Sequence, residues 1–489
     1  MNIFKEAPKN KSAFFLIVLG VFIVILSLLS DIFGVGKTGI KPAALLITTI
    51  GAALALLGVG LLPRNQEKDQ AVPQLSWLTG IRYFPNLLWI VIGFSLAYFI
   101  FLILPMFFDP SHKVVYFEEY LYDLHPIGAD FLTTLDSSKT WFAAGTAQAF
   151  YPPLTMILFA PLTLIGYPGN YYLITIMTVV SYFIAGGLIP FLLAEKANRS
   201  VIPFIFGVSI FSYGFQFELE RGQFHTIAML LCILAIYLFH RHPHYRFFAY
   251  LLFCISVQLK IYPALLVVMF VDDWRDWKTN LKRFALLGLV NFALLFLLGY
   301  SYFSKFITHM LASSVDPHEI WRGNHSITSF LSIFSSPRYQ LLDLNLLSWL
   351  QKNISLVTYL FLAYFVICFL LVWLNAYRRN THGLDSFLWM TCVLGGLIIP
   401  AVNHDYTLPL LTAPFALIVS ERFTQNVPGR MLVILLLLVA SFSYTTTLVP
   451  FIHKPRHLQD TFPLLIILLT ITTLLSFLRD KEEIEPATT

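Results

Sequence analysis

The residues best suited to chemistry begin with an acid, Asp130, that lies shortly before an apolar stretch of the chain. Its neighbours in the sequence GADF (128–131) are small or apolar, which would place the carboxylate at a partly dehydrated interface and suit it to act as a general base. A Tyr-Pro-Pro at 151–153 then begins the apolar stretch. Proline is favoured in the first turn of a helix, because its missing N–H would have no partner there. The alternative interpretations of Asp130 are a solvated loop carboxylate and a helix N-cap.

A second group of polar residues, ERGQFH (220–225), interrupts two apolar runs. Charged side chains within a membrane usually mark function, and this makes Arg221 and Gln223 candidates for substrate binding. A plain interfacial turn would contain the same residues. Lys260, in QLKIYP (258–263), lies in the middle of an apolar run. Either a lipid phosphate or an acid on a neighbouring helix would satisfy its charge.

Two further polar segments lie later in the chain. WRGNHSI (321–327) combines Arg322, which suits a phosphate, with Asn324 and with His325, whose imidazole titrates near neutral pH. The alternative is a polar loop in which Ser326 caps a helix. NHDY (403–406) lies between two apolar runs, where its polar side chains are costly unless they meet water or a substrate.

Composition identifies an integral membrane protein. Of the 489 residues, 57% are hydrophobic, 16% are aromatic and only 12% are charged, whereas soluble domains carry about 25% charged residues. The net charge of +5 is modest and dispersed, so it does not indicate nucleic-acid binding. The four cysteines fall in separate apolar runs and show no metal or disulfide spacing. The first apolar run, 13–33, is too long for a cleavable signal peptide.

Hydropathy predicts an all-α bundle of about 13–14 transmembrane helices with long outer loops, each span being near the length that crosses a hydrocarbon core of about 30 Å. The spans are 13–33, 43–62, 86–108, 152–167, 170–194, 201–217, 224–240, 247–270, 284–304, 355–377, 386–401, 405–421, 430–451 and 462–478.

Four regions follow from these spans. They are an N-terminal helix pair with a polar linker (1–85), a catalytic membrane module (86–304) with a first outer loop at 109–151, a second outer loop (305–354), and C-terminal helices with a short tail (355–489). Lysines in the N-terminal tail place it inside. Alternation then puts both long loops outside and the basic cluster at 275–283 inside. It also puts Lys196 with Arg199, and Arg241 with Arg246, outside, against the positive-inside rule.

Taken together, these motifs resemble the polyprenyl-phosphate-dependent glycosyltransferases of the GT-C class. The bacterial GT87 group, which includes the mannosyltransferases of phosphatidylinositol mannoside synthesis, is the most similar. The resemblance runs from about residue 86 to 450 and depends on the order and placement of short motifs. These are Asp130, the Tyr-Pro-Pro at 151–153 with Pro161, Gly222-Gln223, Lys260 with Pro263, the Gly-Asn-His-Ser at 323–326, and His404.

The resemblance implies a multi-pass protein of the bacterial inner membrane whose active site faces outside. It implies transfer of a hexose or pentose, with a mannose-like sugar as the best choice, from a polyprenyl-phosphate sugar to a lipid or glycan hydroxyl. Asp130 would be the general base, and His325 would assist it or contact the donor phosphate. The candidates for donor-phosphate or substrate binding are Arg322, Asn324, Lys260, Arg221, Gln223, His404, Asp405 and Tyr151.

No cofactor is expected, and no metal, because the sequence has neither an Asp-x-Asp motif nor a ligand cluster of fixed spacing. Arg322 or Lys260 would supply the countercharge for the leaving phosphate. The chain departs from the family pattern in three places: the helix pair before residue 63 is extra, position 325 is often Gln in relatives, and Asn403-His404-Asp405 replaces an aromatic residue and paired histidines.

Two other classes of function fit parts of the pattern. Another enzyme of lipid-linked glycan assembly, a polymerase or ligase, would also use aromatic, charged outer loops, but such enzymes commonly depend on arginines and a histidine instead of an early acid. A transporter or flippase would favour repeat symmetry and several charges within broken helices. The sequence shows no repeat, and its polar groups gather in the predicted outer loops, which favours an enzyme.

Overall fold

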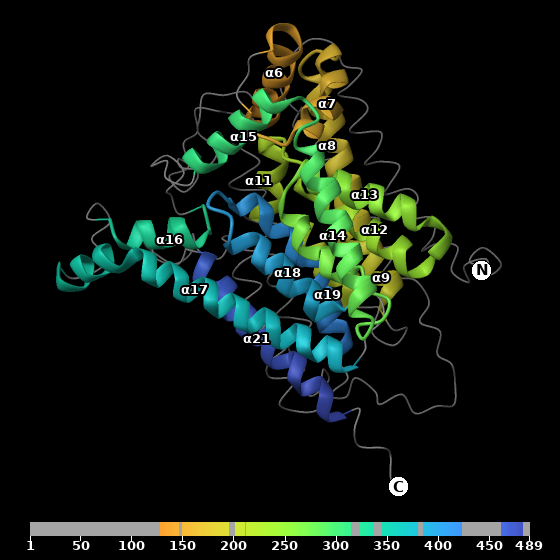
Figure 1. The fold of residues 1–489 in the computed structure, drawn as a ribbon, viewed down its shortest axis with the longest axis vertical. Helices are drawn as coiled ribbons and strands as arrows, with labels where there is room; N and C mark the ends of the chain where they lie inside the picture. Colours follow the sequence, from red (N-terminus) through yellow and green to blue (C-terminus); the bar gives the residue numbers. More distant parts are fainter. Residues whose placement is uncertain are drawn as a thin grey trace.

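All regular structure in the described part of the chain is helical (Figure 1). The computed structural model describes residues 128–145, 149–194, 201–210, 212–313, 323–336, 344–379, 385–422 and 461–482. The predicted all-α fold is confirmed for these ranges. Several predicted features lie outside the described residues: the helix pair and linker at 1–85, the span at 86–108, the loop at 109–127, the span at 430–451, and Arg322.

The helices in chain order are α6 (Ala129–Ala144), α7 (Pro153–Phe159), η2 (Ala160–Leu164), α8 (Gly169–Tyr182), η3 (Phe183–Leu188), α9 (Ile189–Leu193), α10 (Val201–Ile210), α11 (Tyr213–Arg221), α12 (His225–Arg241), η5 (Pro243–Tyr245), α13 (Arg246–Leu259), η6 (Tyr262–Met269), α14 (Trp277–Leu294), α15 (Tyr300–Ser313), α16 (Ile327–Phe334), α17 (Leu344–Arg379), α18 (Ser386–Ile398), η8 (Asp405–Leu411), α19 (Thr412–Arg422) and α21 (Thr461–Glu482). The two regions predicted as long outer loops are therefore largely helical where they are described. They contain α6, α16, most of α15 and the start of α17.

The bundle is built around α18. All 13 of its residues are buried, as expected of a helix that is apolar on every side. It packs against α17, α19, α21 and η6. Gly395 permits the approach of α17, because a Cβ at this position would overlap the ring of Phe365. Since α18 ends at Ile398, it carries the polar residues that follow to one end of the bundle.

The apolar stretch predicted as a single crossing at 247–270 is in fact a hairpin, and its first arm is α13. This helix starts beside the end of α12, where the guanidinium carbon of Arg246 lies 4.8 Å from the centre of the Phe239 ring. It finishes beside the start of α12, where the Ser256 hydroxyl donates to the Ala228 carbonyl at 2.6 Å. The two helices are therefore antiparallel along most of their length.

The second arm of the hairpin is the 3₁₀ helix η6, which returns along α12. The chain leaves the α-helix at Lys260, whose backbone is extended (φ −148°, ψ 135°). The Tyr262 hydroxyl then donates to the His225 carbonyl at 2.7 Å, at the start of α12. Met269 brings its carbonyl oxygen within 2.8 Å of His240 Nε2, near the end of α12. Lys260 thus lies at the tip of a hairpin and not in mid-span.

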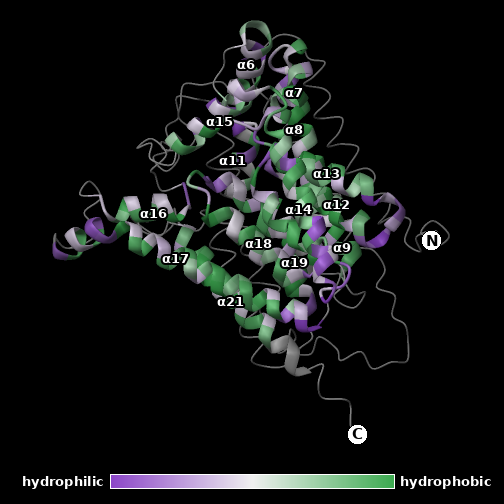
Figure 2. Ribbon diagram, in the orientation of Figure 1, coloured by the Kyte–Doolittle hydropathy of each residue, from purple (hydrophilic) through white to green (hydrophobic). Residues whose placement is uncertain are grey.

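This hairpin gathers basic residues at one end of the bundle. Asp272, directly after η6, accepts from Arg246 at 2.7 Å and from Arg283 at 3.1 Å. The α12–α13 connection, with Arg241, therefore shares an end with the 275–283 cluster. The topology predicted from alternation had put these two segments on opposite sides, because it counted 247–270 as one crossing. Figure 2 shows hydrophilic residues at this end and around α11, with apolar helices between them.

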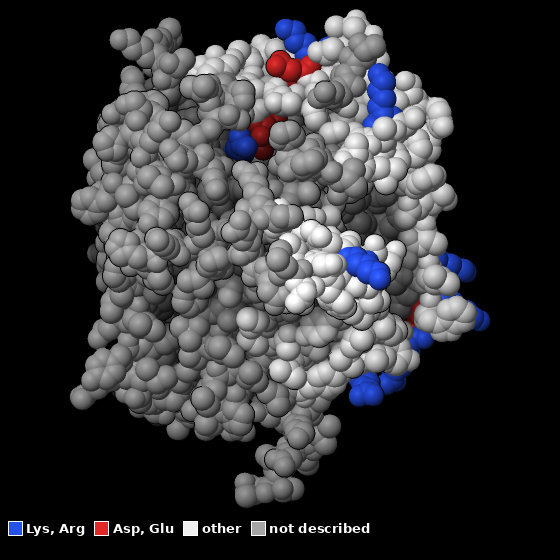
Figure 3. Space-filling model, turned by 90° about the vertical axis from the view of Figure 1, so that its left-hand side faces the viewer, with Lys and Arg blue, Asp and Glu red and all other residues white. Residues whose placement is uncertain are grey.

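The described helices expose the apolar surface expected of a membrane protein. Gly169–Leu193 (25 residues) and Asn345–Arg379 (35 residues) are long and apolar enough to cross a bilayer. Large apolar side chains stay exposed along α14 and α17, among them Leu289, Phe292, Leu360 and Ile367. Among the residues that Figure 3 colours, Lys, Arg, Asp and Glu side chains lie singly or in small groups, with uncharged residues between them. Lipid would cover such surfaces.

The hairpin predicts the sidedness of two connections. A cysteine introduced at His244 and one introduced at Lys278 should both react with a membrane-impermeant maleimide from the same side of the membrane. A cysteine at the exposed Lys139 of α6 should react from the other side only. The four native cysteines are buried and give little background. Comparing intact cells with inverted vesicles measures this, and labelling of positions 244 and 278 from opposite sides would exclude the hairpin.

Candidate active site

Asp130 lies in the first turn of α6, and its carboxylate faces the end of α11. Gly128 precedes the helix with a φ of 85°, and no side chain caps it, so the N-cap interpretation of Asp130 does not hold. The Oδ2 atom accepts a hydrogen bond from Gln223 Nε2 at 2.7 Å. The Oδ1 atom lies 3.9 Å from Arg221 Nε, within ion-pair range but beyond hydrogen-bond distance. With its side chain 30% exposed, the acid is oriented but still accessible.

Gln223 connects this acid to Lys260. Its Oε1 atom accepts from Lys260 Nζ at 2.7 Å, while its Nε2 atom serves Asp130. Lys260 Nζ also donates to the Tyr151 hydroxyl at 3.3 Å. The ammonium lies 4.5 Å from the centre of the Tyr151 ring and 4.3 Å from that of Phe224, a geometry that stabilises a cation against aromatic faces. Four predicted site residues, Asp130, Gln223, Lys260 and Tyr151, thus form one cluster, which we call the acid–lysine cluster.

Gly222 makes the close approach of α6 and α11 possible. It ends α11 in the left-handed region, with a φ of 66°, where residues other than glycine are strained. A Cβ at this position would lie 2.8 Å from the Cβ of Phe131 and 3.2 Å from the Cα of Gly128. Any side chain at 222 would therefore push the first turn of α6, and Asp130 with it, away from Gln223.

Tyr151 is positioned by the two prolines that follow it. Pro152 is the N-cap of α7 and Pro153 is its first residue, as the sequence predicted. The carbonyl oxygen of Tyr151 accepts from the Tyr302 hydroxyl at 2.8 Å. This bond connects the start of α7 to α15 and fixes the direction from which the Tyr151 ring approaches Lys260.

His325 belongs to a second cluster, formed by the segments 323–326 and 401–407. Both of its ring nitrogens have partners there. Its side chain is 0% exposed, and its Nδ1 atom lies 3.2 Å from Asp405 Oδ1. Its Nε2 atom lies 3.2 Å from the Thr407 hydroxyl. Burial lowers the pKa of the His325 imidazole, and the hydrogen bond to Asp405 opposes that shift. Because both ring nitrogens have protein partners, the geometry suits a positioning role for His325.

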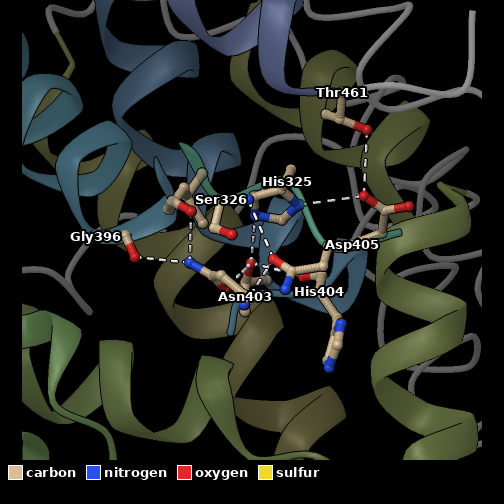
Figure 4. Close-up of polar contacts among 10 residues, drawn as sticks. His325, Ser326, Gly396, Asn403, His404, Asp405 and Thr461 are labelled. Carbon is tan, nitrogen blue, oxygen red and sulfur yellow. Dashed lines mark hydrogen bonds and ion pairs between the residues drawn. The ribbon is translucent and has the colours of Figure 1, made fainter. Parts of the chain in front are cut away.

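The backbone joins the 323–326 segment to the 401–407 segment. The His325 N–H donates to the Asn403 carbonyl, and the Asp405 N–H donates to the Gly323 carbonyl, each at 2.9 Å. Figure 4 shows this cluster, with the His404 side chain pointing away from the His325–Asp405 pair. The side chain of His404 therefore takes no part in the His325–Asp405 contact.

Asn324 and Ser326 secure the same junction with their side chains. Asn324 Oδ1 accepts from the N–H groups of Ser326 and Asn403, each at 3.1 Å, and its Nδ2 donates to the Ala401 carbonyl at 2.9 Å. The Ser326 hydroxyl donates to the Ala401 carbonyl at 2.8 Å and accepts from the Ser329 N–H at 3.1 Å. The interpretation of Ser326 as a helix cap is thus confirmed.

A chain of ring contacts links the two clusters. The guanidinium of Arg221, the ion-pair partner of Asp130, lies over the Phe217 ring at 5.7 Å. Phe217 contacts Tyr406, with ring centres 5.4 Å apart. Tyr406 in turn contacts His404, at 5.2 Å. The early acid and the two later polar segments are therefore parts of one region at the end of the bundle opposite to the basic cluster.

The sequence profile of glycosyltransferase family 87 matches residues 149–402, just over half of the chain. The chain belongs to glycosyltransferase family 87. It is accordingly a membrane glycosyltransferase. The match contains Tyr151, Gln223, Lys260 and His325, while Asp130 lies before it and His404 lies after it. No curated protein and no solved structure matches the chain.

Two further residues beside these clusters were not predicted as site residues from the sequence. Glu218 is 0% exposed, and its Oε1 atom accepts from the Thr226 N–H at 2.8 Å and from the Thr226 hydroxyl at 3.2 Å. Burial raises the pKa of the Glu218 carboxyl to about 8. His225 lies between two tyrosine rings at the start of α12. Within the described ranges, no group of three or more His, Cys, Asp and Glu residues is placed to hold a metal ion.

The hydrogen bonds of Asn403 in the second cluster predict that Asn403→Ala strongly destabilises the protein. Asn403 Nδ2 donates to the carbonyls of Gly396 and Leu397 at 2.7 and 2.8 Å, and its Oδ1 accepts from Thr407 at 2.8 Å. Asn403→Ala leaves these buried groups without partners and should lower the free energy of unfolding by about 2–3 kcal/mol. Thermal unfolding in detergent measures the loss. The exposed Asn345→Ala is the control, and equal melting temperatures for the two variants would contradict the assignment.

Proposed function

We propose that this enzyme transfers a hexose or pentose, with a mannose-like sugar as the best choice, from a polyprenyl-phosphate donor to a hydroxyl of a lipid or glycan acceptor. The observation that carries the proposal is the acid–lysine cluster. A single amide holds a carboxylate at one end and an ammonium at the other, with hydrogen bonds of 2.7 Å on both sides. A displacement at a phosphate-linked anomeric carbon needs one base and one countercharge, and the cluster offers both.

Each member of the cluster has a defined part in the proposed reaction. The acceptor oxygen attacks the anomeric carbon while its proton passes to Asp130, and the bond from that carbon to the donor phosphate oxygen breaks with inversion. The polyprenyl monophosphate leaves with the electron pair of the broken bond. Lys260 counters its charge, so that the step proceeds without a divalent metal. Because Gln223 occupies Oδ2 of Asp130, Oδ1 is the oxygen that receives the proton.

The remaining candidates divide by their contacts. The side chains of three candidates, Asn324, His325 and Asp405, bond within the second cluster. We therefore assign these residues to positioning. His404 points away from that pair (Figure 4), and it contacts Tyr406. We assign it to the donor, together with Tyr151, whose hydroxyl lies 3.3 Å from Lys260 Nζ.

The distribution of charge supports an active site at the outer face of a bacterial inner membrane. The basic cluster formed by Arg246, Arg283 and their neighbours lies at the far end of α12 from Gln223. Basic connections prefer the cytoplasmic side. Once 247–270 is counted as a hairpin, Arg241 and Arg246 join the inner group instead of violating the rule.

Loss of the base tests the proposal most directly. Asp130→Asn keeps the shape of the side chain but removes its ability to accept the proton, so sugar transfer should fall by about 10²–10⁴-fold. Purified protein is assayed with a panel of short-chain polyprenyl-phosphate sugars and a membrane-lipid extract, and product mass identifies the sugar. Asp136→Asn, on the exposed face of the same helix, is the matched control. A fully active Asp130→Asn protein would remove the assigned base.

The countercharge gives a second test. Lys260→Gln replaces the ammonium by a neutral amide, and the rate of transfer should fall by at least about 10-fold because the charge on the leaving phosphate is no longer countered. Single-turnover rates with the preferred donor provide the measurement. Lys278→Gln, on the exposed start of α14, is the control. Unchanged rates in Lys260→Gln would assign the countercharge to another residue.

A further inference from the structure

His225 is a buried imidazole with unused hydrogen-bonding capacity in the part of the chain that the structure describes. The residue is 7% exposed, and neither Nδ1 nor Nε2 has a hydrogen-bond partner among the described residues. Buried polar side-chain atoms almost always have a partner, because leaving them unpaired is costly. His325, in the same region, has a partner on each ring nitrogen. His225, unlike His325, therefore keeps hydrogen-bonding capacity that a ligand could use.

Two tyrosine rings hold the His225 imidazole in place. The centre of the Tyr262 ring lies 5.8 Å away in a stacked arrangement, and that of the Tyr406 ring lies 5.1 Å away at 34°. The Tyr262 hydroxyl also donates to the backbone carbonyl of His225 at 2.7 Å. These three contacts hold the imidazole in place without using either of its nitrogens. Aromatic surfaces beside a few polar groups are typical of small-molecule sites.

His225 lies next to the proposed phosphate countercharge. Gln223, which accepts from Lys260 Nζ, is two residues earlier in the chain. The Lys260 ammonium lies 4.3 Å from the ring centre of Phe224, the residue directly before His225. Burial without an anionic partner favours the neutral imidazole, which carries one N–H donor and one lone pair.

The bonding capacity of the ring selects among the parts of the donor. Phosphate oxygens accept hydrogen bonds, so a phosphate would use the N–H and leave the lone pair unpaired. Sugar hydroxyls both donate and accept, so one hydroxyl of a sugar can accept from the N–H of a neutral imidazole while another donates to its lone pair. In a phosphate-linked sugar, the group directly beside the phosphate is the sugar ring. With the phosphate at Lys260, the hydroxyls of that ring are the groups within reach of His225.

We propose that His225 binds a hydroxyl of the transferred sugar and thereby determines which sugar donors the enzyme accepts. The inference depends on the proposed function, since it takes the donor phosphate to lie at Lys260. His225 is then a specificity-determining residue. Tyr262 and Tyr406 orient it and present aromatic surface to the C–H groups of the sugar.

The test uses the full-length purified protein and donors that lack one hydroxyl each. The sugar that the donor panel identifies is prepared as a series of monodeoxy short-chain polyprenyl-phosphate donors. The unaltered enzyme should lose about 10- to 100-fold in kcat/KM with the deoxy donor whose missing hydroxyl bonds His225. His225→Phe keeps an aromatic ring without the nitrogens. Its kcat/KM should be low with the parent donor and should not fall further with that one deoxy donor.

Two more variants complete the design. His225→Gln replaces the imidazole by an amide, which also has a donor and an acceptor. It should recover part of the discrimination between the parent and the deoxy donor. This variant keeps the test valid if His225→Phe folds poorly. His244→Phe makes the same change at an exposed position beyond the end of α12 and should behave as the unaltered enzyme. If the enzyme transfers sugar but every variant at 225 shows the same penalties across the deoxy series, the inference is wrong. Absence of transfer from any donor by the unaltered enzyme would instead refute the proposed function.

Discussion

The active-site region depends on the orientation of one side-chain amide, that of Gln223. The carboxylate of Asp130 requires the NH₂ group on its side and the ammonium of Lys260 requires the oxygen on the other, so the two charges leave a single orientation possible. A direct ion pair between acid and lysine would engage each charge with the other. The intervening neutral amide holds them apart at fixed positions, and each keeps hydrogen-bonding capacity for a substrate.

The position of Gln223 is in turn fixed from both sides along the chain. On one side, Gly222 ends α11 in the left-handed region, and its lack of a side chain lets α6 pack closely enough for Asp130 to reach the amide. On the other side, α12 begins within two residues, and the buried carboxylate of Glu218 accepts from the Thr226 N–H in its first turn. A buried acid at a helix start satisfies backbone donors that have no partner within the helix. The turn between α11 and α12 is therefore held on both sides of Gln223, and the positions of Asp130 and Lys260 depend on it.

The types of the local residues made several members of this site predictable from the sequence. Contacts between distant segments could not be predicted in this way. Gln223 and Lys260 stand out in the sequence because they interrupt apolar runs, Asp130 stands out as an acid among small and apolar neighbours, and the proline pair marked the start of α7. The hairpin at Lys260 was missed because hydropathy is the same for a helix that continues and for one that turns back. The pairing of His325 with Asp405 joins segments 80 positions apart, and no local pattern reports such a contact. Glu218 was missed for a related reason: its importance comes from burial, which a single acid in a polar segment does not reveal.

The break at Lys260 also explains why the proline pair and the lysine belong together. Where α13 ends, the Gln258 carbonyl has no intrahelical partner, and within a membrane such a group cannot turn to water. The Thr155 hydroxyl of α7 donates to it at 2.6 Å. The two prolines start α7 so that Thr155 lies in its first turn, and the same turn brings the Tyr151 hydroxyl to Lys260 Nζ. One short helix therefore satisfies the broken backbone and brings Tyr151 to the buried ammonium of Lys260, and a helix that continued through 260 would need neither. The cation is available at this end of the bundle because α13 stops there and α7 makes the stop stable.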